Sequence, residues 1–217
     1  MGAMEFDWRS EAEKLVEWSI VPRGIRKMYA EVFKKVPRHE FVPERMRVYA
    51  YEDRPLPIGF DQTISQPSLV AFMTQAVDAK AGDMVLDVGT GSGYQAAILA
   101  ELGCHVYSVE FIPELAFRAR DVFEKLGYEV FQVVGDANAP FKDESFDAII
   151  VACSLMYYPR NLFKALKVGG KAVYPIGGRY FQDLVLAEKR EDKVYTRRLL
   201  SCAFVPMKGG YAWKDEE

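Results

Sequence analysis

A glycine-rich segment at residues 87–94, DVGTGSGY, is the part of the chain whose residue types and spacing point most directly to chemistry. It follows an apolar stretch at 84–86 and precedes a helix-forming stretch at 95–102, so it predicts a tight turn from a strand into a helix. Glycine lacks a Cβ atom, which keeps such a turn tight and lets a ligand touch the backbone. A turn of this kind can be purely structural, but ligands of open α/β sheets bind at the carboxyl ends of strands. We therefore predict a ligand site here.

The ligand at this turn is predicted to carry positive charge. The spacing of Gly89, Gly91 and Gly93 differs from the G-x-G-x-x-G pattern of dinucleotide sites. Asp87, two residues before the first of these glycines, would repel a pyrophosphate. S-adenosylmethionine has no phosphate and carries a sulfonium and an ammonium group, so an acidic residue at the strand end suits it. The pattern favours this cofactor over a dinucleotide, which argues against a dehydrogenase.

Two further acidic residues follow at the ends of the next predicted strands. Glu110 lies about 20 residues after the glycine turn, where a carboxylate can accept hydrogen bonds from both ribose hydroxyls. Asp136, after the third strand, could accept a hydrogen bond from the adenine amino group. Each acid taken singly also fits the role of a helix cap. Three such residues in order at successive strand ends favour a nucleoside-type cofactor.

The elements that must position these residues alternate between strands and helices. Strands are predicted at 84–88, 105–110, 129–134, 147–152 and 171–175, and helices at 95–102, 114–126 and 160–166. The stretches 183–187 and 194–205 read as strands with no long helix between them, which predicts antiparallel pairing. The order predicts an α/β fold: a Rossmann-like, doubly wound, mostly parallel sheet with an antiparallel C-terminal edge and N-terminal helices.

The first third of the chain is predicted to be helical and then irregular. Residues 11–36 have helical spacing interrupted at 22–24, which predicts two short helices. Residues 36–66 contain four prolines and are expected to be extended or irregular, as functional loops inside compact domains often are. A helix follows at 69–77, with Pro67 in its first turn and Ser65 or Ser68 able to cap it.

Composition excludes several other classes of protein. The 217 residues carry 28 Lys and Arg against 31 Asp and Glu, a net charge of -3 that does not indicate a nucleic-acid or anionic-membrane partner. No apolar run approaches the roughly 18 residues of a membrane span, and the charged N-terminus is unlike a signal peptide, so we expect a cytoplasmic monomer. Three dispersed cysteines and two histidines predict neither disulfides nor a metal site.

The motifs of this chain resemble those of a known family. DVGTGSGY at 87–94 is similar to the first motif of class I methyltransferases. The flanking motifs VPRHEFV at 36–42, PLPIG at 55–59, QTISQP at 62–67, KVGGK at 167–171 and FVP at 204–206 resemble the protein-L-isoaspartate O-methyltransferase family. The resemblance spans about residues 25–213, and its most specific parts are the loop at 55–67 and the FVP segment.

The resemblance implies a role for each matching residue. It implies one methyltransferase domain over 1–217, with N-terminal helices and a substrate and cofactor loop at 5–66 and a Rossmann-like core at 67–217. It implies S-adenosylmethionine as cofactor, S-adenosylhomocysteine as product and isoaspartyl peptides or proteins as partners, in a repair reaction. Ser65 is the implied active-site residue. The implied cofactor-binding residues are Gln62, Thr63, Ile64, Ser65, Asp87, Gly89, Thr90, Gly91, Ser92, Gly93, Glu110, Asp136 and Ala137. The implied substrate-binding residues are Leu56, Pro57, Ile58, Gly59 and Val205.

Several alternatives stay open at this point. The serine at 65 could orient the substrate carboxylate, cap the helix that starts near Pro67, or do both. The chain departs from the family at ACSLMYYP, 152–159, and at GDAN, 135–138, so a paralogous methyltransferase with a different acceptor is the main alternative. A cofactor-binding protein without turnover is a further alternative, which the intact Ser65 and the intact loop at 53–59 disfavour. The cations Arg54 and Arg179 could attract an acidic substrate or simply be solvated surface charges.

Overall fold

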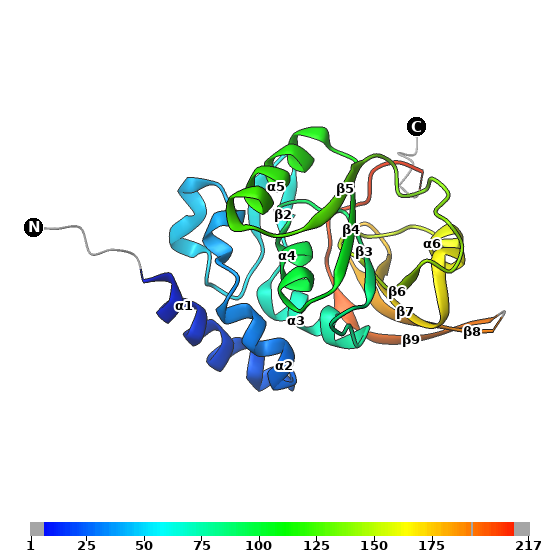
Figure 1. Ribbon diagram of the computed structural model, residues 1–217, viewed down its shortest axis with the longest axis horizontal. Helices are drawn as coiled ribbons and strands as arrows, with labels where there is room; N and C mark the ends of the chain where they lie inside the picture. Colours follow the sequence, from blue (N-terminus) through cyan, green and yellow to red (C-terminus); the bar gives the residue numbers. More distant parts are fainter. Residues whose placement is uncertain (1–6, 192, 211–217) are drawn as a thin grey trace, which may run out of the picture.

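The structure is a computed structural model that describes residues 7–191 and 193–210. The expected domain limits at residues 1, 5 and 217, and the end of the family resemblance at 213, lie outside the described residues. Figure 1 shows helices on the N-terminal side of the molecule and a large sheet on the C-terminal side.

A seven-stranded sheet in the order β5-β4-β3-β6-β7-β8-β9 forms the centre of the fold. The pairs from β5 to β7 are parallel, and the pairs β7 to β8 and β8 to β9 are antiparallel. This confirms the predicted doubly wound sheet with an antiparallel C-terminal edge. The strands are β3 (Met84–Val88), β4 (His105–Glu110), β5 (Val130–Val134), β6 (Phe146–Val151), β7 (Leu166–Gly177), β8 (Gln182–Arg190) and β9 (Lys193–Cys202).

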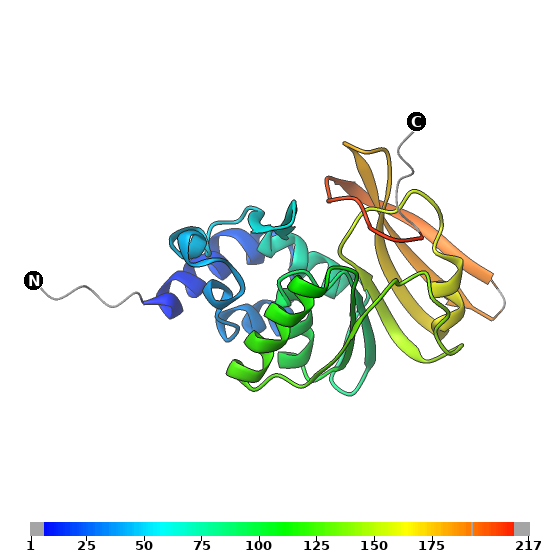
Figure 2. The same cartoon turned by 90° about the horizontal axis from the view of Figure 1, so that it is seen from above.

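Helices cover both faces of this sheet. The helices are α3 (Pro67–Ala76), α4 (Tyr94–Glu101), α5 (Pro113–Leu126) and α6 (Arg160–Ala165). Along β6, Ala148 and Ile150 join the core under α3, α4 and α5, whereas Ile149 and Val151 join the core under α6. This alternation follows from the two-residue period of a strand, and Figure 2 shows α6 across the sheet from the other helices.

The N-terminal helices form an outer layer against α3 and α4. They are α1 (Trp8–Leu15) and α2 (Lys27–Ala30), extended by a π turn η1 (Val16–Ile20) and the 3₁₀ turns η2 (Val21–Arg23) and η3 (Glu31–Lys34). Gly24, with a φ of 76°, ends the first helical stretch, which confirms the predicted break at 22–24. Phe33 packs edge-on against Tyr94 of α4, with ring centroids 6.1 Å apart.

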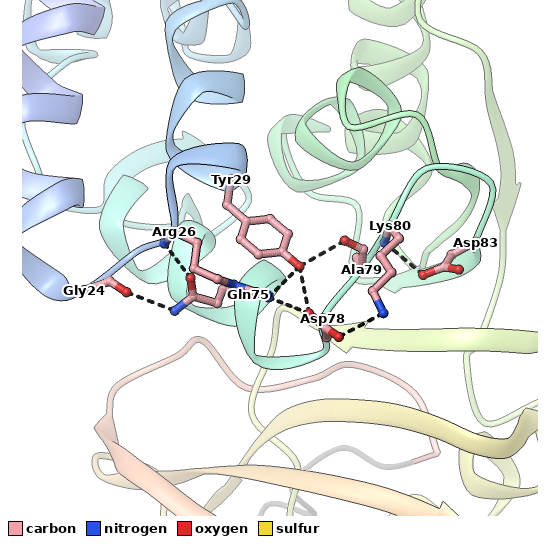
Figure 3. A network of polar contacts seen from close by, with 8 residues as sticks. All are labelled: Gly24, Arg26, Tyr29, Gln75, Asp78, Ala79, Lys80 and Asp83. Carbon is pink, nitrogen blue, oxygen red and sulfur yellow. Dashed lines mark hydrogen bonds and ion pairs between the residues drawn. The ribbon is translucent and has the colours of Figure 1, made fainter.

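A polar network fixes the start of α2 to the C-terminal end of α3 (Figure 3). The Gln75 side chain accepts a hydrogen bond from Arg26 N at 2.6 Å and donates one to Gly24 O at 3.2 Å. The Arg26 guanidinium donates to Asp78 and to the Tyr29 hydroxyl, which is itself 3.2 Å from Asp78 Oδ1. The Arg26 cation lowers the pKa of Asp78 to about 2, against the opposing effect of partial burial. Gly24 and the start of α2 are therefore held to the end of α3.

Residues 36–66 are more regular than predicted. The 3₁₀ helices η4 (Arg38–Phe41) and η5 (Glu44–Tyr49) occupy the first half. The second half contains a hairpin of β1 (Leu56–Gly59) and β2 (Gln62–Ile64), closed by Phe60 and Asp61 with φ of 55° and 57°. The expectation of an extended or irregular segment is confirmed for the extended hairpin and wrong for the two 3₁₀ helices. Pro37 and Pro43 precede these helices directly, at positions where a missing N–H costs nothing.

The described residues contain neither a membrane-spanning helix nor a cluster of metal ligands. None of the described helices is long and apolar enough to cross a membrane. No group of three or more His, Cys, Asp or Glu side chains within 7–191 and 193–210 is placed to hold a metal ion.

Candidate active site

The parallel strands bring the predicted cofactor residues to one edge of the sheet. Strands β3, β4, β5 and β6 run in the same direction, so their carboxyl ends lie side by side. Residues after these ends include the glycine turn after β3, Glu110 at the end of β4 and Gly135 after β5. The register pairs Asp87 with Ser108 and Glu110 with Val134, which places the two acids on neighbouring strands.

The glycine turn has a backbone that needs glycine. Gly89, Gly91 and Gly93 have φ of 85°, 52° and 89°, in the left-handed region that other residues rarely adopt. Gly89 N donates to Val109 O at 2.9 Å, which ties the turn to β4. A Cβ on Gly93 would lie 2.7 Å from the Phe123 ring, so this glycine also allows α5 to pack against the turn. The turn is thus held from both sides.

Asp87 is a completely buried acid at the end of β3, with an exposed fraction of 0%. Its Oδ2 accepts a hydrogen bond from Ser108 Oγ at 2.9 Å, and its Oδ1 has no partner among the described residues. Burial raises the pKa of Asp87 to about 7; the nearby charge of Glu110 adds to this effect, and the Ser108 hydrogen bond opposes it. The structure thus holds a carboxyl group with a free oxygen whose charge a cationic ligand would stabilise.

Glu110 holds the glycine turn and also lines a small cavity beside that turn. Its Oε2 accepts from Gly91 N at 2.7 Å, and its Oε1 accepts from Ile112 N at 2.9 Å. Each carboxylate oxygen can accept more than one hydrogen bond, so capacity remains for ribose hydroxyls. The backbone role could not be read from the sequence. The ribose contact stays a prediction.

The Asp136 carboxylate is used by the protein itself. It accepts hydrogen bonds from Asn138 N and Gly210 N, both at 2.8 Å, and so fastens the C-terminal segment to the end of β5. The cavity beside the glycine turn is lined at this point by Gly135 and Ala137. The adenine contact of Asp136 stays a prediction, since only its two neighbours are among the described lining residues.

Two small cavities, called the cofactor cavities below, flank the glycine turn. One is lined by Gly89, Gly91, Glu110 and residues that the sequence did not single out: Phe111, Ile112, Cys153, Met207 and Lys208. The other is lined by Ile64, Ser65, Gly89, Thr90, Gly91 and Ser92. Phe111 directly follows Glu110 at the end of β4, and this position could have predicted that it lines the site. Met207 and Lys208 come from a distant part of the chain, and no local pattern marks them.

A larger cavity of about 570 Å³ opens next to these two. Its walls come from the start of α3 and from the chain after β9, including Leu69, Phe72, Phe204 and Val205. It shares Thr63 and Ala152 with both small cavities, Val205 with the first, and Ser65 with the second. Ser65 therefore lies where a bound cofactor and a bound acceptor would meet.

The start of α3 is capped by Asp53 and not by a serine. The N-cap residue is Gln66, and its side chain makes no capping hydrogen bond. Asp53 Oδ1 instead accepts from Ser68 N at 2.9 Å, and Oδ2 accepts from Ser68 Oγ at 2.8 Å and Gln66 Nε2 at 2.9 Å. The interpretation of Ser65 or Ser68 as the cap is wrong because a carboxylate 15 residues before Ser68 fills that role.

The predicted substrate residues divide into two groups. Val205 lines the large cavity and the cofactor cavity. Leu56 and Ile58, with exposed fractions of 0% and 3%, point into the core, and Pro57 and Gly59 lie on the hairpin with them. None of residues 56–59 is among the described residues that line the large cavity, which Pro55 does line. Their contact with a peptide stays a prediction.

The cations near the site differ from those considered from the sequence. Arg54 forms an ion pair with Glu52, and neither Arg54 nor Arg179 is among the described residues that line the large cavity. Arg23 is the only charged residue in the described lining of that cavity, and its Nη2 lies 3.1 Å from Asp53 Oδ2. Half of this side chain is exposed, so donors remain for a ligand. Only the tertiary structure identifies it.

The unusual segment 152–159 contributes little bulk to the cavities. Ser154 N donates to Val205 O at 2.8 Å and Ser154 O accepts from Met207 N at 3.0 Å, which brings the C-terminal segment next to β6. Leu155 is buried, and the exposed Tyr157 and Tyr158 are absent from the described linings of all three cavities. The bulky side chains of 155–158 therefore lie outside the described linings of these three cavities.

The residues at the turn fit S-adenosylmethionine. Asp87 has a buried oxygen without a partner in the described structure, and the neighbouring Gly89 and Gly91 line both small cavities. Gln62, Thr63, Gly89 and Glu110 would surround such a ligand. The fold and this site together define a Rossmann-like methyltransferase that depends on S-adenosylmethionine.

Comparison with known proteins supports this class and narrows it. A sequence model described as protein-L-isoaspartate(D-aspartate) O-methyltransferase matches residues 11–212, and the chain belongs to this family. It is 46% identical over 211 residues to a protein-L-isoaspartate O-methyltransferase of Methanoculleus marisnigri, covering 96% of both chains. A solved protein-L-isoaspartate O-methyltransferase superposes with a TM-score of 0.83 at 31% identity, covering 93% of this chain and 67% of the other. A Plasmodium falciparum structure in complex with S-adenosyl-L-homocysteine has a TM-score of 0.78 at 25% identity, covering 94% and 99%.

Proposed function

We propose that this protein transfers the methyl group of S-adenosylmethionine to the free carboxylate of L-isoaspartyl residues in damaged proteins or peptides. The observation that carries the proposal is the meeting of the large cavity with the cofactor cavities at Thr63, Ser65 and Ala152. A cofactor at the glycine turn and a peptide in the large cavity would present methyl group and carboxylate to each other there. The family relationship identifies the acceptor.

The reaction needs placement more than acid–base chemistry. An aspartyl-type carboxylate has an unperturbed pKa of about 3.9, so it is already the anionic nucleophile at neutral pH and no general base is required. When bound, S-adenosylmethionine supplies an electrophilic methyl group on its sulfonium. The chain holds the two reactants in line and excludes water, and such orientation can contribute roughly 7–11 kcal/mol at best.

Ser65 is proposed to orient the carboxylate. With helix capping assigned to Asp53, the Ser65 hydroxyl has no structural role as a cap. It lines both the large cavity and a cofactor cavity, where it can donate a hydrogen bond to one carboxylate oxygen and leave the other facing the methyl group. Ser65→Ala should therefore lower turnover more than tenfold, with a loss of stability within about 0.5 kcal/mol.

The product explains a repair function. Methylation turns a carboxylate oxygen, which cannot leave, into a methoxy leaving group. The backbone nitrogen of the following residue can then attack the ester carbonyl, close a succinimide ring and release methanol. Hydrolysis of this ring returns aspartate in part of the molecules. The enzyme then acts again on the isoaspartate that re-forms.

A pair of peptides that differ only in one aspartyl linkage tests the function. We expect methyl incorporation, measured by mass spectrometry, into the isoaspartyl peptide and not into the aspartyl peptide. Discrimination should be strong because a site that hydrogen-bonds the displaced carboxylate leaves polar groups unpaired with the wrong isomer. Equal inactivity on both peptides, with cofactor binding shown by calorimetry, would contradict the proposed acceptor.

A further inference from the structure

Arg38 is a charged residue in the interior of the protein. It lies in η4 (Arg38–Phe41), and its exposed fraction is 0%. Burial lowers the pKa of Arg38 to about 10, so the side chain is still protonated at neutral pH. A buried guanidinium without hydrogen-bond partners would destabilise the fold by several kcal/mol. The contacts of Arg38 therefore show which interactions offset this cost.

The contacts of Arg38 join separate segments of the chain. Its Nε donates to Ala50 O at 2.8 Å, and its Nη2 donates to Ser65 O at 2.8 Å, with a longer contact to Arg54 O at 3.5 Å. The guanidinium also stacks over the Tyr94 ring, 4.6 Å from its centroid. Tyr94 is the first residue of α4 and directly follows the glycine turn.

This arrangement sets the distance between Ser65 and the cofactor turn. A guanidinium is planar and rigid, so a carbonyl bound to one of its nitrogens and the aromatic ring that its Cζ lies over keep a fixed relation to each other. The carbonyl of Ser65 is anchored in this way, while the residue also lines the large cavity and a cofactor cavity. An ammonium group cannot reproduce this geometry, because it is a point charge without a plane.

We propose that Arg38 is a positioning residue, which holds the Ser65 hydroxyl in register with the methyl group by clamping the Ser65 backbone to α4. The inference rests on the proposed function of Ser65 and extends it to a residue outside the site. Arg38 acts through Ser65 and touches neither reactant. Its removal should slow the methyl transfer step and leave the cofactor bound.

A double-mutant cycle between Arg38→Lys and Ser65→Ala tests this coupling. Arg38→Lys should lower kcat about tenfold, with the Kd for S-adenosylmethionine unchanged within about twofold. In the Ser65→Ala background, Arg38→Lys should lower kcat no further, because the hydroxyl that it positions is gone. If Arg38→Lys does not fold, Arg38→Gln, which still donates to one carbonyl, takes its place.

Arg26→Lys is the matched control. Arg26 also bridges the N-terminal layer and the core, through Asp78 and Tyr29, but it binds at the far end of α3 (Figure 3). Arg26→Lys should lower the stability of the protein without lowering kcat. Hydrogen exchange adds a readout that needs no substrate: the amides of 62–66 should exchange faster in Arg38→Lys and not in Arg26→Lys.

The outcomes separate this proposal from the proposed function. Multiplicative losses of kcat in the double variant, or unchanged exchange at 62–66, would overturn the positioning role. Inactivity of the wild type on the isoaspartyl peptide would overturn the acceptor instead, and the exchange experiment would still decide the role of Arg38.

Discussion

Replacing Asp87 with asparagine should move the stability of the cofactor-free protein and its affinity for S-adenosylmethionine in opposite directions. Asp87 is fully buried, and one of its oxygens has no partner in the described structure. Its charge is unfavourable in the free protein because it has lost its water. The same charge is favourable when a cationic ligand lies beside it. Asparagine has nearly the same shape and cannot ionise.

The pKa of Asp87 sets the size of the effect. Folding raises this pKa from 3.8 to about 7, and each unit corresponds to about 1.36 kcal/mol. The folded state therefore keeps its proton at pH values where the unfolded chain has lost it, and stability falls as pH rises from about 4 to about 7. The wild type should lose about 2.5 kcal/mol between pH 5 and pH 8 from this group. Asp87→Asn should not show this loss.

Cofactor binding should show the complementary pH dependence. A cationic ligand favours ionised Asp87, so binding below pH 7 should release a proton, and affinity should rise by up to about tenfold per pH unit from 5 to 7. Urea denaturation across this range and calorimetry in two buffers of different ionisation enthalpy measure the two quantities. Adenosine, which lacks both cationic groups, is the control ligand. Parallel stability curves for wild type and variant, or a pH-independent affinity for S-adenosylmethionine, would refute the reasoning.

Three further substitutions test the site and its turn, and a fourth, Gly127→Ala, is a control for the last of them. Glu110→Gln removes a charge and one acceptor, so calorimetry should show S-adenosylmethionine binding weaker by about 1.5–3 kcal/mol. Arg23→Gln removes the cation of the large cavity and should raise the KM for an isoaspartyl peptide about threefold or more at low salt, with kcat unchanged and the difference shrinking in added salt. Gly93→Ala should cost about 2 kcal/mol or more in urea denaturation, since its Cβ would meet the Phe123 ring. Gly127→Ala, at φ of 74° in open space, should cost only about 1 kcal/mol.

The central sheet could be predicted closely because its pattern is local. Residues 84–88 and 105–110 are predicted strands and observed strands with the same limits. Parallel strands buried on both faces have continuous apolar runs, and glycine marks their ends. The start of β7 was missed by five residues, since Gly169 and Gly170 look like a turn between a helix and a strand. In the structure they belong to the irregular first part of β7, where its pairing with β6 shifts register.

The polar contacts of the site could not be predicted in the same way. Asp53 caps α3, and Arg38 binds Ser65 O, across 15 and 27 residues of sequence. No periodicity relates such positions, and the short-range preferences of serine favoured the wrong cap. The acids at strand ends were found because topology alone brings them together. These acids also bind backbone groups from later parts of the chain, such as Gly210 N at Asp136. Such contacts depend on where those later parts lie in the fold.

The return of the C-terminal segment has a consequence for the synthesis of the protein. Val205, Met207 and Lys208 line the cofactor cavity, and the segment is fastened to Ser154 and Asp136. The lining also includes Gln62 and Thr63 from the first third of the chain. A nascent chain that has folded its parallel strands on the ribosome therefore still has an open binding cavity. The enzyme should gain full affinity for its cofactor only after residue 208 has left the ribosome.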